Sequence, residues 1–156
     1  MFNLVQELAA LIRRFREDQI DYAICGGVAM ALHGFTRATE DTDVLIEAES
    51  LPRIRVLALQ CGFRLMGTQP DLQFTSGARL VRLVKAEPGS EDYLVLDLMP
   101  ASGPNSDAWA SRHDHETQWG SFRVVSREAL KNMKRESGRP QDLADAHRLD
   151  NPDEAS

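Results

Sequence analysis

Two aspartates carry the clearest chemical signal in the sequence. Asp41 and Asp43 stand two residues apart in a segment, 41–47, whose alternating pattern predicts a β-strand. Side chains at i and i+2 of a strand project from the same face, so the two carboxylates would lie side by side and repel each other. A divalent cation removes that repulsion, and oxygen ligands are those that Mg²⁺ prefers. The spacing therefore predicts a magnesium site on this strand.

A third carboxylate interrupts an otherwise apolar segment. Asp97 lies within a predicted strand at 93–98, where an acid is rarely buried without a partner. If the two strands are neighbours, Asp41, Asp43 and Asp97 converge and can hold two metal ions roughly 3.5–4 Å apart, an arrangement suited to in-line phosphoryl or nucleotidyl transfer. We predict these three residues as the catalytic residues and as the ligands of two Mg²⁺ ions, with Mn²⁺ as an alternative.

Simpler structural interpretations exist for the same acids. Asp41 and Asp43 can form the solvated edge of a strand, and Asp97 can pair with an arginine such as Arg79 or Arg82. These interpretations need no metal, and they remain open at the level of sequence.

Two adjacent glycines precede the acidic strand by thirteen residues. Gly26 and Gly27 follow a predicted strand at 20–25 and open a short predicted helix at 28–33. Glycines at such a junction leave backbone N–H groups uncovered, so phosphate oxygens can approach closely. The pair predicts a phosphate-binding turn, although a tight turn without a ligand is the structural alternative.

Helices and strands alternate along the chain around these residues. Hydrophobic spacing predicts helices with N-caps at Asn3, Ser50, Ser126 and Asp142, and Gly138 is expected to end the third of them. We predict an α/β (α+β) fold, in which helices flank a mixed β-sheet. The expected strands are 20–25, 41–47, 63–66, 72–75, 80–85, 93–98 and 122–125, with a hairpin at 88–90 and a short helix near Trp109.

Length and composition restrict the class of protein. The chain has 156 residues, of which 42% are hydrophobic, and a net charge of −6. These values are ordinary for one globular domain, which we place at 1–149, followed by an acidic tail at 150–156. No apolar run approaches the roughly 20 residues of a membrane span, and no signal peptide is recognised, so we expect a cytoplasmic protein without a membrane partner.

The segment His113-Asp-His-Glu116 also contains metal-binding residue types. Its spacing matches no standard structural zinc site, and we interpret it as a solvated loop. A zinc site and a loop that contacts an acceptor are the alternatives. Trp109 and Trp119 flank this segment, and packing of the loop is favoured over stacking on a base.

The residues between the glycines and the acids resemble a known superfamily. Cys25-Gly-Gly-Val-Ala-Met-Ala-Leu-His-Gly34 followed by Arg37-Ala-Thr-Glu-Asp-Thr-Asp-Val-Leu-Ile46 is similar to the core motif of the nucleotidyltransferases typified by DNA polymerase beta. The small bacterial branch with abortive-infection type IV toxins and lincosamide nucleotidyltransferases is the most similar. A C-terminal segment, from Lys134 through Gly138-Arg139 to Asp142 and Asp145, resembles a less specific signature of the same relatives.

The resemblance implies a minimal nucleotidyltransferase fold and roles for further residues. It implies that Asp41 and Asp43 bind both magnesium ions and that Asp97 binds the catalytic metal and helps to deprotonate the attacking hydroxyl. The residues implied to bind the nucleotide are Gly26, Gly27, Arg37, Thr39, Lys134 and Arg139. Basic residues near the end of a helix are also favoured by the helix dipole, which is the structural alternative for Lys134 and Arg139.

Three functional hypotheses follow. The first is a Mg²⁺-dependent nucleotidyltransferase that moves a nucleoside monophosphate from an NTP to a hydroxyl of a small molecule, an RNA or a protein and releases pyrophosphate. The second is a degenerate, non-catalytic interaction module, such as a toxin–antitoxin component. Many relatives carry a further helical domain for the acceptor, and no counterpart of it is recognised in these 156 residues. We therefore expect that a protein partner or a second copy of the chain (a homodimer) could supply acceptor recognition. The third is a metal-dependent phosphohydrolase that uses the same acids.

Overall fold

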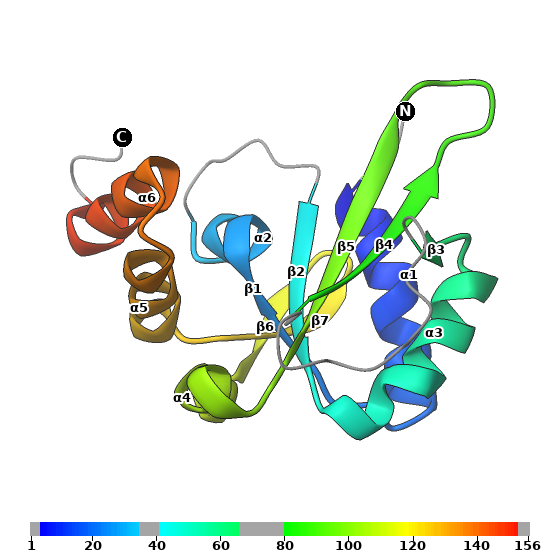
Figure 1. Ribbon diagram of the computed structural model, residues 1–156, viewed down its shortest axis with the longest axis horizontal. Coiled ribbons are helices and arrows are strands. Elements are labelled where there is room, and N and C mark those ends of the chain that lie inside the picture. Colours follow the sequence, from blue (N-terminus) through cyan, green and yellow to red (C-terminus); the bar gives the residue numbers. More distant parts are fainter. Residues whose placement is uncertain (1–3, 35–40, 66–79, 153–156) are drawn as a thin grey trace.

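A mixed β-sheet forms the centre of the part of the chain that the computed structural model describes, residues 4–34, 41–65 and 80–152 (Figure 1). Within these ranges seven strands follow the order β3-β4-β5-β2-β1-β7-β6. The predicted α/β fold with a mixed sheet is confirmed. The strands are β1 (Ala23–Cys25), β2 (Asp41–Ile46), β3 (Arg64–Leu65), β4 (Val81–Ala86), β5 (Tyr93–Pro100), β6 (His113–Thr117) and β7 (Gly120–Val124).

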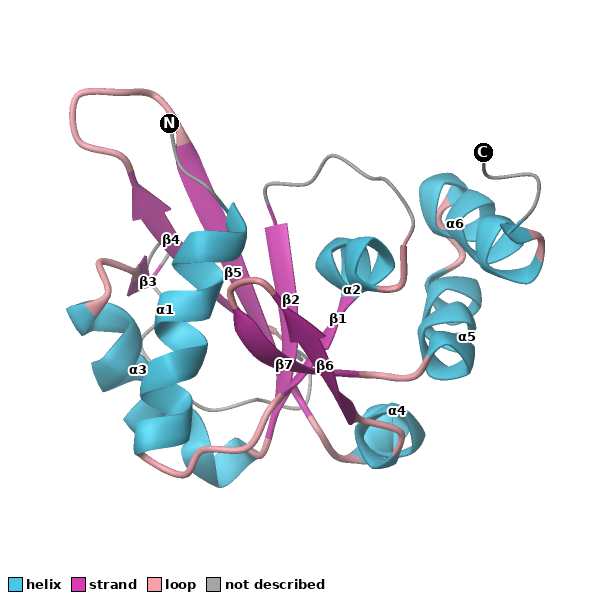
Figure 2. Ribbon diagram, turned by 180° about the vertical axis from the view of Figure 1, so that it is seen from behind, coloured by secondary structure: helices cyan, strands magenta, loops and turns pink. Residues whose placement is uncertain are grey.

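Helices cover the sheet unevenly. Figures 1 and 2 show α1 and α3 together on one side of the sheet, whereas α5 and α6 form a separate pair beyond α2. No helix in the described ranges has the length and apolar character needed to cross a membrane. The helices are α1 (Leu4–Glu17), α2 (Gly26–Leu32), α3 (Leu51–Gln60), α4 (Ser106–Ala110), α5 (Arg127–Ser137) and α6 (Pro140–Asp150), with short 3₁₀ turns at Ala48–Ser50 and Gly103–Asn105.

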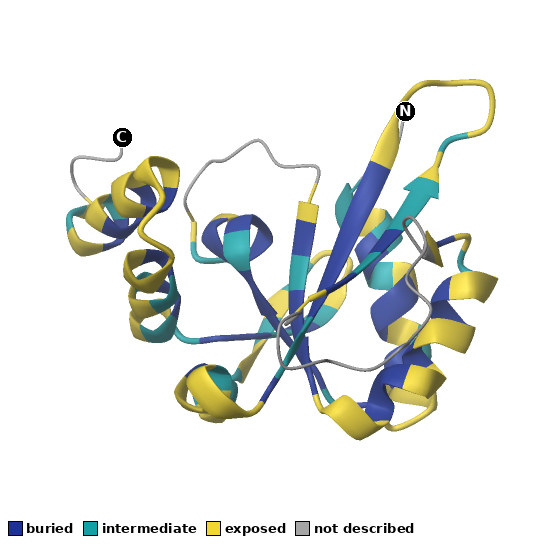
Figure 3. Cartoon of the chain, in the orientation of Figure 1, coloured by how far each residue is buried: buried dark blue, intermediate teal, exposed yellow. Residues whose placement is uncertain are grey.

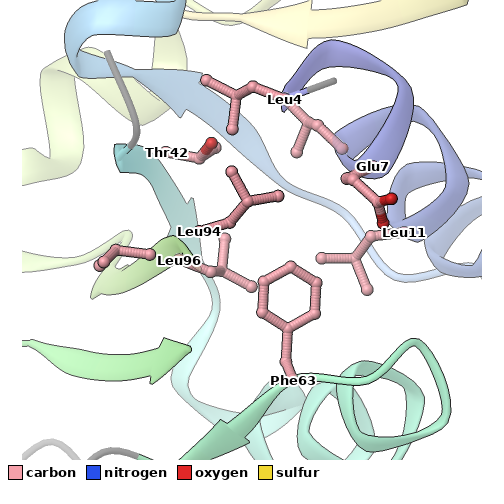
Figure 4. A pocket seen from close by; sticks show the side chains of 9 residues that line it. Leu4, Glu7, Leu11, Thr42, Phe63, Leu94 and Leu96 are labelled. Atoms are coloured by element: carbon pink, nitrogen blue, oxygen red, sulfur yellow. The ribbon is translucent and has the colours of Figure 1, made fainter. Parts of the chain in front are cut away.

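The main core lies between α1 and the sheet. The apolar stripe of α1 is buried, and the gap that remains between it and the strands has a volume of only about 10 Å³ (Figure 4). Leu94 and Leu96 of β5 and Thr42 of β2 face this core (Figure 4). Because side chains alternate along a strand, the neighbours Asp41 and Asp43 must face the opposite side of the sheet, away from α1. Figure 3 shows the buried centre of these strands.

Parallel pairing of β2 and β5 places two of the predicted acids side by side. In this register Asp43 lies opposite Asp97, and Asp41 lies opposite Val95. The predicted hairpin is also present, because β4 and β5 pair in antiparallel fashion around the turn at 88–90. The strands that carry the acids are thus direct neighbours at the centre of the sheet.

The 113–116 segment differs from its prediction. It is not a solvated loop but the edge strand β6, which pairs with β7. Exposed polar side chains are normal on an edge strand, and this composition concealed the strand in the sequence. The segment is separated from β2 by β7 and β1, so it lies away from the acids. No group of three or more potential metal ligands occurs in the described ranges, 113–116 included. Trp109 packs against the core, as expected, whereas Trp119 is exposed, contrary to the packing predicted for it.

Helix starts agree with the sequence in two cases and differ in one. Ser126 caps α5, and Gly138 ends it with φ of +68°. Ser50 immediately precedes α3, as predicted, although it has helical backbone angles and its side chain makes no capping hydrogen bond. Asp142 is not an N-cap, because α6 already begins at Pro140, where the fixed φ of proline suits the first turn.

Other boundaries differ by a few residues. The first strand begins at Ala23 rather than at residue 20, and Gly26 and Gly27 are the first residues of α2 rather than a turn before it. The predicted cap Asn3 and the predicted strand 72–75 lie outside the described residues.

The capping of α5 leads to a stability prediction. The Ser126 side chain accepts a hydrogen bond from the Ala129 backbone N–H at 3.0 Å, so Ser126→Ala should lower the free energy of unfolding by about 1 kcal/mol. Urea unfolding monitored by circular dichroism measures the change. Ser50→Ala is the matched control, since Ser50 makes no capping bond. Equal losses in both variants would contradict the assignment.

Candidate active site

The predicted acids gather on the sheet face that points away from α1. A row of paired positions crosses four strands, from Arg82 on β4 through Asp97 and Asp43 to Cys25 on β1. Asp41 precedes Asp43 by two residues and occupies the exposed start of β2. The expectation that the two acidic strands are neighbours is therefore confirmed.

Asp43 is the electrostatically strained member of this group. Burial raises the pKa of its carboxyl from 3.8 to about 6, and the charges of Asp97 and Asp41 add to the effect. The structure gives this carboxylate no hydrogen bond or ion pair with any described residue. Lys134 and Arg139 lower the pKa only in part. Asp43 thus presents a partly buried charge that has no direct counterion among the described residues.

Asp97 is held by an arginine on the neighbouring strand. Arg82 donates from Nε to Oδ1 at 2.7 Å and from Nη2 to Oδ2 at 2.9 Å, a bidentate pair. Asp97 is 5% exposed, and its hydrogen bonds raise the pKa of Arg82. The alternative interpretation of Asp97 as an arginine partner is thus confirmed for Arg82, whereas Arg79 lies outside the described residues. Both oxygens of Asp97 thus accept hydrogen bonds from Arg82.

Gly26 lies against the Asp43 carboxylate. Its φ is +69°, and a Cβ placed on it would stand 2.0 Å from Asp43 Oδ2. Any other residue would therefore be strained twice, once by its backbone conformation and once by the overlap with the acid. Gly27 is buried within α2. This packing requirement for Gly26 is a role that sequence reasoning missed, because only the fold places Asp43 beside it.

The close approach of Gly26 predicts a specific defect. Gly26→Ala should displace the Asp43 carboxylate and lower the free energy of unfolding by about 2 kcal/mol or more. Gly89→Ala is the matched control, because Gly89 has φ of +77° with no atom within 4 Å of a Cβ. Denaturant titration of both variants separates the overlap from the backbone strain. If both variants lose the same free energy of unfolding, the overlap with Asp43 makes no measurable contribution to it.

A second charged group lies on α5 and α6. Lys134 is buried, and its Nζ lies 3.3 Å from Asp142 Oδ1 and 3.1 Å from Asp145 Oδ2. Burial would raise the pKa of Asp142, but Ser137, Arg139 and Lys134 outweigh that effect and lower it. Arg139 Nε also bonds Asp142 Oδ2 at 2.8 Å. Asp142 and Asp145, at positions i and i+3 of α6, thus hold Lys134. From the sequence only the spacing of these two acids was visible, and it did not indicate this contact.

A cavity of about 300 Å³ joins the two groups. Five of the predicted residues line it, namely Gly26, Asp43, Asp97, Lys134 and Arg139. Asp41 lines an adjoining cavity instead. Arg37 and Thr39 lie outside the described residues. The arrangement combines carboxylates and cations in one cavity, which suits a metal-bound phosphate ester.

Comparison with known proteins identifies the architecture. No protein-family model matches this sequence, and no curated protein matches it. Solved structures do match. A lincosamide antibiotic adenylyltransferase, LnuA, with lincomycin bound, has a TM-score of 0.62 at 17% identity, and the match covers 94% of this chain and 96% of that chain. The chain has a nucleotidyltransferase fold.

Two further nucleotidyltransferase structures agree. ANT(2")-Ia in complex with adenylyl-2"-tobramycin has a TM-score of 0.63 at 16% identity, with 91% of this chain and 84% of that chain covered. A nucleotidyltransferase-like protein from Paracoccidioides brasiliensis has a TM-score of 0.59 at 18% identity over 92% and 74%. The expected nucleotidyltransferase fold is therefore confirmed. These identities are low, and the likeness is one of fold.

Proposed function

We propose that this protein is a Mg²⁺-dependent nucleotidyltransferase that transfers a nucleoside monophosphate from an NTP to a hydroxyl. The observation that supports this most is the Asp43 carboxylate. It has no direct counterion in the described chain, its pKa is raised to about 6, and it faces a cavity beside Asp97 in a nucleotidyltransferase fold. A group that is costly to keep charged is a typical ligand of a divalent cation.

Two carboxylates suffice for magnesium, which usually takes one or two of them and completes its shell with water and phosphate oxygens. Asp41 and Asp43 offer carboxylate oxygens from one strand face, and Asp97 lies opposite Asp43. Asp97 would join them only after giving up at least one of its bonds to Arg82. When bound, Mg²⁺ or Mn²⁺ would polarise the phosphoryl oxygens and lower the pKa of a bound hydroxyl.

The surrounding residues define the reaction that we propose. The hydroxyl oxygen of the acceptor would form a bond to the α-phosphorus, while the bond from that phosphorus to the bridging oxygen breaks and pyrophosphate leaves. Asp97 would accept the hydroxyl proton. Arg139 bonds Asp142 through Nε, and its terminal guanidinium nitrogens would contact the phosphates. The backbone at Gly26 would contact them from the other element.

The similar structures support a small-molecule acceptor. Lincomycin and tobramycin are the compounds associated with LnuA and ANT(2")-Ia, respectively. The net charge of −6 also argues against an extended RNA, which needs many phosphate contacts. We therefore propose a small hydroxyl compound as the acceptor.

The direct test is nucleotide binding by calorimetry with and without Mg²⁺, followed by incubation with labelled NTPs and candidate acceptors. Wild type should bind an NTP only with the metal, and Asp41→Ala should lose this binding. Glu91→Gln is the control, because Glu91 is an exposed residue of the β4–β5 turn. Absence of any metal-dependent NTP affinity would refute the proposal. Release of phosphate instead of pyrophosphate would favour the hydrolase hypothesis.

A further inference from the structure

A second, larger cavity adjoins the acids on the side away from α5 and α6. Its volume is about 730 Å³, and Arg82 borders both cavities. The acids therefore stand between two spaces, of which only the smaller contains Gly26, Lys134 and Arg139. The larger is lined by Asp41, Arg64, Arg82, Val84, Tyr93 and Val95, among others.

The register of the sheet fixes how this lining is laid out. One row of paired positions runs from Arg64 on β3 through Val84 and Val95 to Asp41 on β2. The next row towards the hairpin pairs Ala86 with Tyr93, and the next row in the other direction pairs Arg82 with Asp97. Rows two residues apart present side chains on the same face. The cavity floor is thus an apolar platform, formed by Val84, Val95 and their neighbours, with charged residues at its ends.

The two ends of this platform carry opposite charge. Asp41 and the other acids lie at one end. At the far end, three strand spacings or roughly 14 Å away, lies the exposed Arg64. Its Nη1 donates to the backbone oxygens of Phe63 at 3.0 Å and Leu59 at 3.2 Å, and no ion pair with a described carboxylate is made. Tyr93, 50% exposed, adds an aromatic ring at the hairpin side.

We propose that this platform is the acceptor subsite and that the acceptor is a hydroxyl compound with a flat apolar body and an anionic group. The anion binds Arg64, the body lies on Val84 and Val95 beside Tyr93, and the hydroxyl reaches the acids. This inference rests on the proposed nucleotidyl transfer, which defines the smaller cavity as the nucleotide side. The guanidinium of Arg64 would repel an amine placed at the same point, so a polycation is the wrong class of acceptor.

A matched pair of probes tests this assignment without any chemistry. The probes are 4′-(hydroxymethyl)biphenyl-4-carboxylate and 4′-(hydroxymethyl)biphenyl-4-methanamine, which differ only in the charged group. Calorimetry on the full chain, without nucleotide, should show the carboxylate binding at least tenfold more tightly. Arg64→Gln should remove this preference. Arg55→Gln, on an exposed face of α3, should leave it intact.

Equal affinity for the two probes, tighter binding of the amine, or an unchanged preference in Arg64→Gln would each overturn the inference. The proposed transfer is tested separately through the metal-dependent affinity for an NTP. Loss of NTP affinity with the carboxylate preference intact would refute the proposed function, because the platform would then serve another activity. NTP affinity without the preference would refute the acceptor class alone.

Discussion

Asp43→Asn is expected to abolish nucleotidyl transfer and, at the same time, to stabilise the metal-free protein. The pKa of Asp43 is raised from 3.8 to about 6, so the folded state holds a proton more tightly than the unfolded chain. The free energy of unfolding therefore falls as the pH rises from 3.8 to about 6, and the whole loss is present above about pH 6. This difference in pKa corresponds to about 3 kcal/mol of unfolding free energy. Asparagine has nearly the same shape and no charge, so most of this cost disappears.

The measurement is urea unfolding in EDTA at pH 7.5 and at pH 4. We expect Asp43→Asn to gain about 1–3 kcal/mol at pH 7.5 and almost nothing at pH 4, where the wild-type acid is already protonated. Added Mg²⁺ should stabilise wild type but not the variant, because only the charged carboxylate attracts the metal. Transfer should fall by at least about 10³-fold. A variant that is less stable than wild type at pH 7.5 would show that the charge of Asp43 does not destabilise the metal-free protein.

Lys134→Met should be strongly destabilising, because Lys134 is buried between two aspartates. It would leave the Asp142 and Asp145 carboxylates buried beside each other without their shared ammonium. Removing one partner of a buried ion pair typically costs about 3–5 kcal/mol. Asp142 would keep its bonds from Arg139 and Ser137, so the larger part of the loss is expected from Asp145. The loss should shrink at low pH, where the aspartates take up protons.

The control for this variant lies one turn earlier on the same helix. Lys131→Met removes an ammonium that pairs with the more exposed Glu128 and Asp150, so a much smaller loss is expected. Adding Asp145→Asn to Lys134→Met should recover part of the stability, because one of the stranded charges is then gone. Similar losses for Lys131→Met and Lys134→Met, or no recovery in the double variant, would show that the buried network is not held by charge.

Much of the fold was predictable because the responsible signals are local. The stripe of α1, the alternation of 41–46 and the cap at Ser126 each depend on residues a few positions apart, and the structure contains all three. The edge strand β6 was missed because its polar residues lack the apolar alternation that marks a half-buried strand. Asp142 was wrongly assigned as a cap, because residue type alone does not show where a helix begins.

That Asp41, Asp43 and Asp97 lie on strands, and that Asp41 and Asp43 share a face, could be predicted from the sequence alone. The contacts of each acid depend on the tertiary structure. The parallel pairing of β2 and β5 brings Asp43 to Asp97, Arg82 of β4 takes the Asp97 carboxylate, and Gly26 leaves the space that Asp43 fills. The physical reason is that side-chain period is a local property of the backbone, whereas strand order, register and burial arise from contacts between distant segments.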